Sequence, residues 1–240
     1  MLKVAITRSH EGNIELANML LKKNVMPIVI DTITYSEPDW SKVDRFLEKI
    51  EEYDWLVFTS ATAVRYFYRR VKELRIPLAN LKARFAAVGN KTAEALKEIG
   101  IEKSFIPSKN TTEGLASELP KEGKRVLLLR SNLANEELYN ILKDRGFEVD
   151  TVSIYNVSFI QEKVRITSEL DAIIFGSASE VRGFINRVKN IEEMKEIPVF
   201  CIGPVTADFA QKKGFKKIII SEEQTFEGVV KELIRRLRYD

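Results

Sequence analysis

The sequence predicts an α/β fold with two doubly wound, parallel-sheet domains. Two observations lead to this prediction: short apolar runs alternate with amphipathic stretches along the whole chain, and the chain goes through this order twice. Runs of three to six mostly apolar residues, without alternation, are typical of parallel strands that are covered on both faces. Strands that alternate with helices imply right-handed crossovers and helices on both sides of each sheet.

Ten segments are predicted as strands and eight as helices. The strands are Val4–Thr7, Ile28–Ile30, Trp55–Thr59, Arg84–Val88, Ser104–Ile106, Arg125–Leu129, Val149–Ile154, Ala172–Phe175, Val199–Ile202 and Lys217–Ile220. The helices are Ile14–Lys23, Ala63–Leu74, Thr92–Ile99, Glu113–Glu118, Glu136–Arg145, Glu180–Val188, Thr206–Lys213 and Phe226–Leu237. Gly100, Gly146 and Gly214 each directly follow a predicted helix, where glycine commonly ends one.

The second half of the chain repeats the first. Residues 54–72 and 171–189 are identical at ten of nineteen aligned positions, whereas unrelated sequences of ordinary composition match at roughly 6% of positions. The segments that follow also align, so that Gly89 pairs with Gly203. This long unit is predicted to contain three strand–helix pairs.

A shorter strand–helix–strand unit is also repeated, and its alignment pairs Arg8 with Arg130. One short and one long unit together make a five-stranded, flavodoxin-like sheet. Two pairings are open. Sequential pairing places a boundary near residues 121–124, and crossed pairing joins the first short unit to the last long unit. The long polar connections at 34–42 and 156–165 favour the crossed pairing.

Composition limits the class of protein. Hydrophobic residues make up 45% of the chain, which is enough for a sizeable core, and the net charge of +3 is too small for a nucleic-acid-coating protein. One cysteine, Cys201, and one histidine, His10, exclude a disulfide framework and metal sites built from several of these residues. The sequence shows neither a signal peptide nor an apolar stretch long enough to span a membrane. We therefore expect a cytoplasmic protein with no nucleic-acid, membrane or metal partner.

The predicted strand ends carry small hydroxyl residues and helix starts. Ligands of doubly wound sheets bind beyond the carboxyl ends of the strands. Serine and threonine commonly cap helices there, which is an ordinary structural role. Eight helix starts from two domains would nevertheless present free N–H groups and positive dipole ends. If both sets face one cleft, it would suit a ligand with many carboxylates.

Other catalytic signatures are weak. The chain has no dinucleotide-binding or P-loop motif, and Gly176–Ser179 lacks the second glycine of a nucleophile elbow. Cys201 is predicted as a buried core thiol, and His10 as a surface loop residue, with a carboxylate contact as the alternative. Tyr155 ends a predicted strand. From the residues alone, half-buried packing is favoured for it over a role as a phenolic general acid.

Five motifs together resemble the uroporphyrinogen-III synthase family. They are Val57–Val64, Ala87–Ala93, Val152–Val157, Phe175–Val181 and Ile202–Ala207. The resemblance runs nearly end to end, and the order, spacing and doubling of the motifs are specific. It implies the crossed pairing, with one domain from residues 1–34 plus 158–240, a second from 38–154, and two-stranded linkers near 35–37 and 155–157.

The resemblance also implies the activity. Members of this family are lyases that need no metal or organic cofactor. They close the linear tetrapyrrole hydroxymethylbilane to uroporphyrinogen III, with loss of water and inversion of the last pyrrole ring through a spiro intermediate. This reaction serves haem, sirohaem and cobalamin biosynthesis. A transient hand-over from the enzyme that makes hydroxymethylbilane and a monomeric state are further expectations. The alternative is a cytosolic two-domain small-molecule binding or sensor module.

Site residues are carried over from the family motifs. Tyr155 matches the family's candidate proton donor. The expected substrate-binding residues are Arg8, Thr59, Ser60, Gly89, Lys91, Thr92, Arg130, Ser177, Ser179, Gly203 and Thr206. Ala61 and Ala178 stand where many relatives have proline, so we expect the first turns of these two helices to differ from those relatives.

Overall fold

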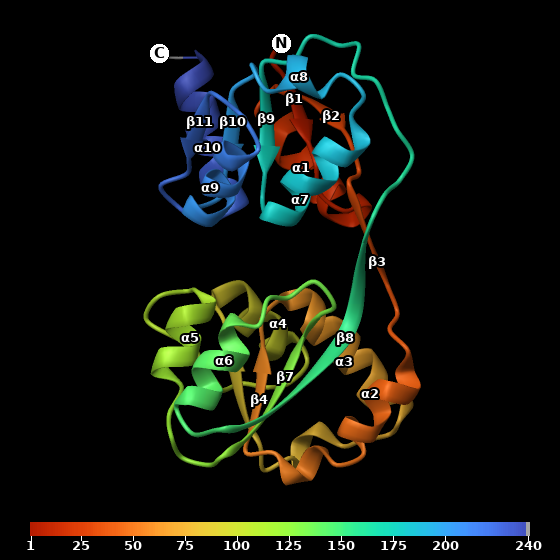
Figure 1. The fold of residues 1–240 in the computed structure, drawn as a ribbon, viewed down its shortest axis with the longest axis vertical. Coiled ribbons are helices and arrows are strands. Elements are labelled where there is room, and N and C mark those ends of the chain that lie inside the picture. Colours follow the sequence, from red (N-terminus) through yellow and green to blue (C-terminus); the bar gives the residue numbers. More distant parts are fainter. Residues whose placement is uncertain (239–240) are drawn as a thin grey trace. The chain divides into compact units, whose positions relative to one another are not determined.

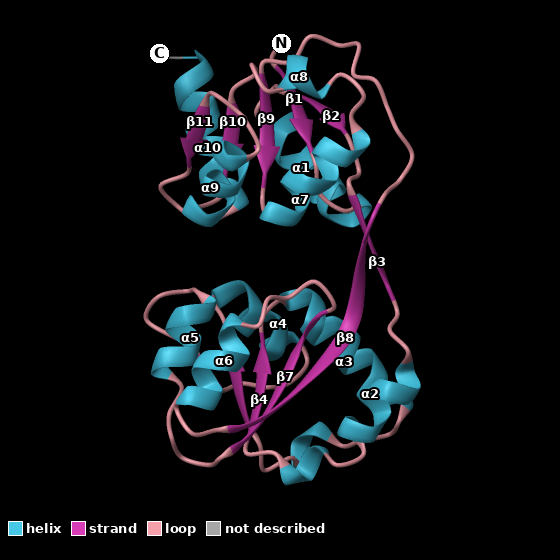
Figure 2. Cartoon of the chain, in the orientation of Figure 1, coloured by secondary structure: helices cyan, strands magenta, loops and turns pink. Residues whose placement is uncertain are grey.

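A computed structural model describes residues 1–238, which form two compact units (Figure 1). Unit 1 comprises Met1–Thr34 and the chain from Ser158 onward, and unit 2 comprises Tyr35–Val157. The chain passes from one unit to the other within β3 (Ile33–Ser36) and again within β8 (Glu148–Phe159). Both units are α/β layers built on parallel strands, so the predicted fold class is confirmed (Figure 2).

Unit 1 contains a five-stranded parallel sheet in the order β11-β10-β9-β1-β2. Its strands are β1 (Lys3–Ile6), β2 (Met26–Val29), β9 (Ala172–Phe175), β10 (Val199–Cys201) and β11 (Ile218–Ile220). Its helices are α1 (His10–Leu21), α7 (Ala178–Arg187), α8 (Ile191–Met194), α9 (Pro204–Lys212) and α10 (Phe226–Arg238). The sheet thus joins strands from the two ends of the chain.

Helices cover both faces of the unit 1 sheet. On one face, Phe175 of β9 packs edge-on against Phe184 of α7, with ring centres 5.5 Å apart. On the other face, Ile6 of β1 belongs to a core with Leu16 of α1 and Leu233 of α10. All of these side chains are essentially inaccessible to solvent. The uniformly apolar strands therefore reflect burial on both sides.

Unit 2 contains a six-stranded sheet in the order β3-β8-β7-β4-β5-β6. Besides β3 and β8, its strands are β4 (Trp55–Phe58), β5 (Arg84–Ala87), β6 (Ser104–Phe105) and β7 (Arg125–Ser131). Its helices are α2 (Trp40–Leu47), α3 (Ala61–Glu73), α4 (Asn90–Glu98), α5 (Thr112–Glu118) and α6 (Glu137–Asp144), with short 3₁₀ turns at Ile50–Glu52 and Leu78–Asn80. Strands β4 to β8 pair in parallel.

The unit 2 core repeats this arrangement. Leu115 of α5 and Leu138 of α6 pack on the face of the sheet that carries Leu128. Phe58 of β4 packs edge-on against Phe67 of α3, with ring centres 5.2 Å apart. This sheet has one strand more than the five predicted, because β3 adds to its edge.

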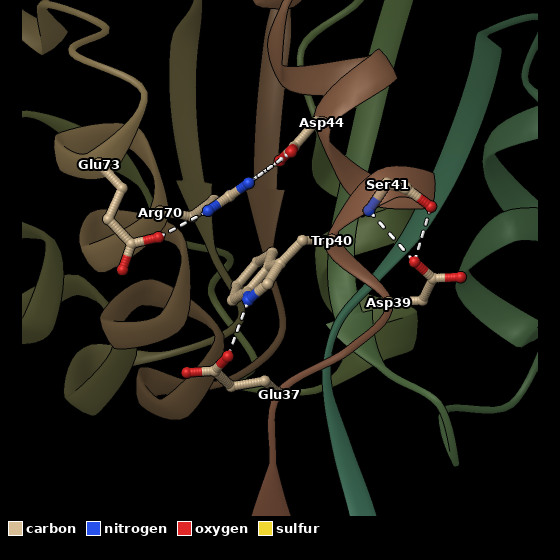
Figure 3. A network of polar contacts seen from close by, with 7 residues as sticks. All are labelled: Glu37, Asp39, Trp40, Ser41, Asp44, Arg70 and Glu73. Atoms are coloured by element: carbon tan, nitrogen blue, oxygen red, sulfur yellow. Dashed lines mark hydrogen bonds and ion pairs between the residues drawn. The ribbon is translucent and has the colours of Figure 1, made fainter.

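The segment at 34–42, predicted as a long polar linker, instead contains β3 and the start of α2. Asp39 caps this helix by accepting the Ser41 N–H at 3.2 Å. Arg70 of α3 binds both carboxylate oxygens of Asp44 in α2, at 2.8 and 2.5 Å, as Figure 3 shows. Its guanidinium also lies 4.9 Å from the ring centre of Trp40. Only Val43 and Leu47 of this eight-residue helix are buried, so its buried apolar pattern is too short to predict it from the sequence.

Several other boundaries differ from the prediction. Helix α1 begins at His10 rather than Ile14, because Ser9 caps it. Residues 155–157, expected as linker, lie inside β8, which is twelve residues long. Across residues 1–238, no helix is both long and apolar enough to cross a membrane.

Candidate functional site

Tyr155 lies within β8 in unit 2, because this strand continues to Phe159 instead of ending before Tyr155 as predicted, and the residue is 7% exposed. Its ring is stacked on Tyr66 of α3, with ring centres 5.6 Å apart, and meets Tyr35 of β3 edge-on at 5.7 Å. Its hydroxyl oxygen lies 3.1 Å from the Oγ of Ser60. Tyr155 therefore has the packing role expected from the residues alone, and its hydroxyl also has Ser60 as a polar partner.

Ser60 links this tyrosine to the start of a helix. It is the N-cap of α3, and its Oγ accepts the Ala63 N–H at 3.0 Å. Burial raises the pKa of Tyr155 above its ordinary value of 10.0, while hydrogen bonds with Ser60 and Ser131 act in the opposite direction. The phenol is thus protonated at neutral pH, which is the form that can donate a proton.

The other unit 2 candidates lie where β4 and β5 meet the helices that follow them. Thr59 is half-buried, directly before the cap of α3. Gly89 precedes α4 and provides no side-chain cap, so the first turn begins with backbone N–H groups alone. In that turn Lys91 is exposed and Thr92 is buried. A Cβ at position 89 would come within 3.1 Å of the Asn110 side chain, so the close approach favours glycine there.

Unit 1 holds the repeat mates in similar local settings. Ser177 caps α7 by accepting the Glu180 N–H at 3.2 Å, and Ser179 is half-buried in the first turn. Gly203 precedes α9 without a side-chain cap, and Thr206 is buried in its first turn. Each unit therefore has one serine-capped helix start and one glycine-preceded helix start among the predicted binding residues.

Glu180 is a buried carboxyl group that the sequence analysis did not select. It is 6% exposed and accepts the Gly176 N–H at 2.7 Å. Burial raises its pKa from 4.5 to about 7, while the Gly176 hydrogen bond and the positive charge of Arg8 work against this rise. A serine followed three residues later by glutamate is the capping-box pattern, so Ser177 and Glu180 carried a usable signal.

The two predicted arginines already have internal partners. Arg8 donates to the Gly12 carbonyl at 2.9 Å, and its guanidinium lies 4.0 Å from the ring centre of Phe226. Arg130 is 7% exposed, and it binds Glu136 and the Asn135 carbonyl, both at 2.5 Å. Arg8 thus binds the first turn of α1, and its repeat mate Arg130 binds the loop between β7 and α6. Their contact with substrate stays a prediction.

His10 and Cys201 can now be placed. His10 is exposed at the first position of α1, and its Nδ1 lies 3.2 Å from a carboxylate oxygen of Asp31. The predicted surface position is therefore confirmed, although the residue begins a helix rather than lying in a loop, and its carboxylate partner is Asp31 of the same chain. Cys201 is fully buried, as predicted. In the described part of the chain, no group of three or more His, Cys, Asp or Glu side chains could hold a metal ion.

The sequence matches the family model described as uroporphyrinogen-III synthase HemD over residues 14–231. It is 30% identical to the porphyrin biosynthesis protein HemD of Ruminiclostridium josui over 97% of the chain, and it spans about half the length of that relative, 48%. It is also 30% identical to the chloroplastic uroporphyrinogen-III synthase of rice, covering 98% of this chain and 80% of the relative.

The fold resembles solved structures over its whole length. A mutant uroporphyrinogen III synthase from Thermus thermophilus superposes with a TM-score of 0.75 and 20% identity, covering 100% of both chains. The uroporphyrinogen-III synthetase of Helicobacter pylori superposes with a TM-score of 0.67 and 19% identity, covering 99% of this chain and 100% of that chain. At such identities the likeness concerns the fold.

Proposed function

Because the chain belongs to the uroporphyrinogen-III synthase family, we propose that Tyr155 is its proton donor and that the helix starts of the two units bind the substrate's carboxylates. The chain is an enzyme of tetrapyrrole biosynthesis and a lyase. Its reaction closes hydroxymethylbilane to uroporphyrinogen III, with loss of water and inversion of the last pyrrole ring.

The first step needs an acid. The carbon–oxygen bond of the hydroxymethyl group breaks while Tyr155 donates its proton, so the hydroxyl leaves as water. The electron pair for this step comes from the adjacent electron-rich pyrrole, which becomes an azafulvene cation. A phenol suits this task because it is protonated at neutral pH and the leaving oxygen needs one proton.

The later steps depend mainly on positioning. The terminal ring attacks through its substituted carbon, forming a spiro intermediate that fragments and recloses with this ring inverted. The newly bonded carbon then loses a proton, and its return to the phenolate of Tyr155 completes the cycle. The enzyme must hold the chain so that this route is faster than spontaneous closure.

The contact between Tyr155 and Ser60, at 3.1 Å, is the observation that supports this assignment. It places a protonated phenol beside the N-terminus of a thirteen-residue helix. The positive end of a helix favours negative charge, and the phenolate formed after proton transfer carries one.

The carboxylate sites are proposed at the serine-capped and glycine-preceded helix starts. In unit 2 these starts carry Thr59, Ser60, Gly89, Lys91 and Thr92, and in unit 1 they carry Ser177, Ser179, Gly203 and Thr206. Backbone N–H groups at a helix start bind anions without a charged side chain. Arg8 and Arg130 add positive charge nearby in the sequence of each unit.

The remaining proposals concern the setting of the reaction. We place the enzyme in the cytoplasm as a monomer that takes a small linear tetrapyrrole as its partner, handed over by the enzyme that produces it. The rice relative is named as chloroplastic, so the compartment differs within the family. A fluorescent fusion expressed in the source cell would test the cytoplasmic assignment.

The test of function uses freshly prepared hydroxymethylbilane. The purified chain is incubated with it, and the oxidised products are separated by isomer. We expect the type III isomer well above the type I product of spontaneous closure. Type I alone would contradict the activity.

The test of Tyr155 uses Tyr155→Phe in the same assay. We expect turnover to fall by roughly 10²-fold, within the range for loss of a general acid, but not to zero, because positioning is retained. Circular dichroism checks that the variant is folded. A fully active Tyr155→Phe enzyme would remove Tyr155 from the mechanism.

A further inference from the structure

We propose that Ser60 is a positioning residue that directs the proton of Tyr155. In this arrangement the Ser60 hydroxyl donates its hydrogen to the phenolic oxygen, and the proton of Tyr155 is left available for the substrate. The inference rests on the proposed role of Tyr155 as proton donor. It gives Ser60 a function separate from the carboxylate binding expected from the family motif.

The hydrogen-bond inventory of the pair favours this direction. A serine hydroxyl has one proton and can accept at its lone pairs. The Oγ of Ser60 already accepts the Ala63 N–H at 3.0 Å, and the oxygen of Tyr155 lies 3.1 Å away. If Tyr155 donated to Ser60 instead, its own proton would be used inside the pair. Donation from Ser60 leaves the phenol proton for the substrate or for Ser131, the other hydrogen-bond partner of this hydroxyl.

The helix start strengthens the donor. Ser60 caps α3, whose thirteen residues give it a positive N-terminal end. A hydroxyl that accepts a hydrogen bond becomes a better donor, because hydrogen bonds in a chain polarise one another. The chain from the Ala63 N–H through Ser60 to Tyr155 therefore stabilises the phenolate that proton transfer creates.

The aromatic neighbours hold the ring independently of Ser60. Tyr66 of α3 stacks on the Tyr155 ring, and Tyr35 of β3 meets it edge-on. Arg69, which pairs with Glu37 at 2.7 Å, lies 4.9 Å from the ring centre of Tyr66. Because two rings keep Tyr155 in place, loss of the Ser60 hydroxyl should change the hydrogen bonding of the phenol more than the position of its ring.

The sequence repeat provides an internal comparison. Ser177, the repeat mate of Ser60, has the same capping role, and Glu180 stands where unit 2 has Ala63. A hydrogen bond with Ser177 also lowers the pKa of Glu180, so the capping serine of unit 1 has a titratable partner as well. In unit 2 alanine replaces that carboxyl group, and the phenol of Tyr155 is the group beside the capping serine.

The first measurement follows Tyr155 in the free protein. Biosynthetic 3-fluorotyrosine lowers phenol pKa values into a range where the protein is folded, and ¹⁹F NMR follows each residue, with Tyr155 assigned from Tyr155→Phe. Loss of the Ser60 hydroxyl in Ser60→Ala and Ser60→Gly should raise the pKa of Tyr155 by roughly 0.5–1 unit. Ser60→Thr retains the hydroxyl and should leave this pKa near that of the parent protein.

The variants separate the hydroxyl from the helix cap. Glycine caps a helix nearly as well as serine but has no hydroxyl, whereas alanine lacks both properties. The matched control is Thr111→Gly, which removes another capping hydroxyl of unit 2 that accepts the Gly114 N–H at 3.0 Å. This control should leave the pKa of Tyr155 unchanged.

The second measurement is kinetic. Ser60→Gly should lower kcat at least several-fold, in addition to any rise in KM from a lost carboxylate contact, and the alkaline limb of its pH profile should move to higher pH. Ser60→Thr should restore both. The proposal is overturned if the pKa of Tyr155 is the same in Ser60→Gly and the parent, or if Ser60→Gly changes KM alone. A fully active Tyr155→Phe would instead refute the donor role and leave the NMR result standing.

Discussion

Replacement of Glu180 by glutamine should make unit 1 more stable at alkaline pH and remove part of its pH dependence. Glu180 is 6% exposed, and burial raises its pKa to about 7. Glutamine has nearly the same shape, and its amide oxygen can still accept the Gly176 N–H. The substitution therefore removes the titration while it leaves the packing and this hydrogen bond in place.

The expected magnitude follows from the pKa difference between the folded and unfolded states. The ordinary value is 4.5 and the folded value is about 7. Between these values the folded state binds more protons than the unfolded state, so the free energy of unfolding falls as pH rises through this window. Each unit corresponds to 1.36 kcal/mol, which gives a loss of about 3 kcal/mol that is complete above pH 7. The free energy of unfolding of Glu180→Gln should not fall in this pH window, because glutamine does not titrate.

The assay is urea unfolding of both proteins at pH 4.5, 6 and 8, followed by far-ultraviolet circular dichroism. The two tryptophans, Trp40 and Trp55, both belong to unit 2, so their fluorescence reports on unit 2 and serves as the control. At pH 8 the variant should exceed the parent by up to about 3 kcal/mol, and the difference should shrink towards pH 4.5. A difference that is the same at all three pH values would refute the reasoning.

Two further predictions concern backbone conformation and thiol reactivity. Gly123→Ala should cost about 3 kcal/mol or more and Gly100→Ala about 1–2 kcal/mol. Both glycines have φ near +90°, but only at position 123 would a Cβ come within 2.4 Å of Asp54. The free energy of unfolding is measured in urea by tryptophan fluorescence. An equal decrease for the two variants would contradict this prediction. Burial raises the pKa of the Cys201 thiol to about 12, so it should be inert to a disulfide reagent at pH 8 until urea is added, and rapid labelling of the folded protein would count against its burial.

The candidate site could be predicted only in part from the sequence. Ser60 and Ser177 were found because both follow an apolar run and open an amphipathic segment. The polar groups beside these serines, Tyr155 and Glu180, could not be assigned to them from the sequence. Tyr155 is 95 residues from Ser60 in the chain, and no local pattern connects them. The capping-box pattern of Ser177 and Glu180 could have indicated the contact of Glu180 with the helix start, whereas helical periodicity alone predicts only that Glu180 begins a helix.

The limits of the fold prediction have similar causes. Strands β4 and β9 are entirely buried and apolar, so their sequence pattern located them well. Helix α2 has only one buried apolar pair and is held on α3 by the contact of Arg70 with Asp44. That contact joins residues 26 positions apart, which a reading of local periodicity does not see.

By itself, the sequence determined most of the strands and helices, that the chain is duplicated, and which family its motifs resemble. These properties depend on neighbouring residues and on hydrophobic periodicity. Only the tertiary structure decided that β3 extends one sheet, that Arg8 and Arg130 bind the backbone that follows them in the chain, and that the Tyr155 hydroxyl meets a capping serine. Such contacts depend on strand order and side-chain packing, which bring together residues that are distant in the chain.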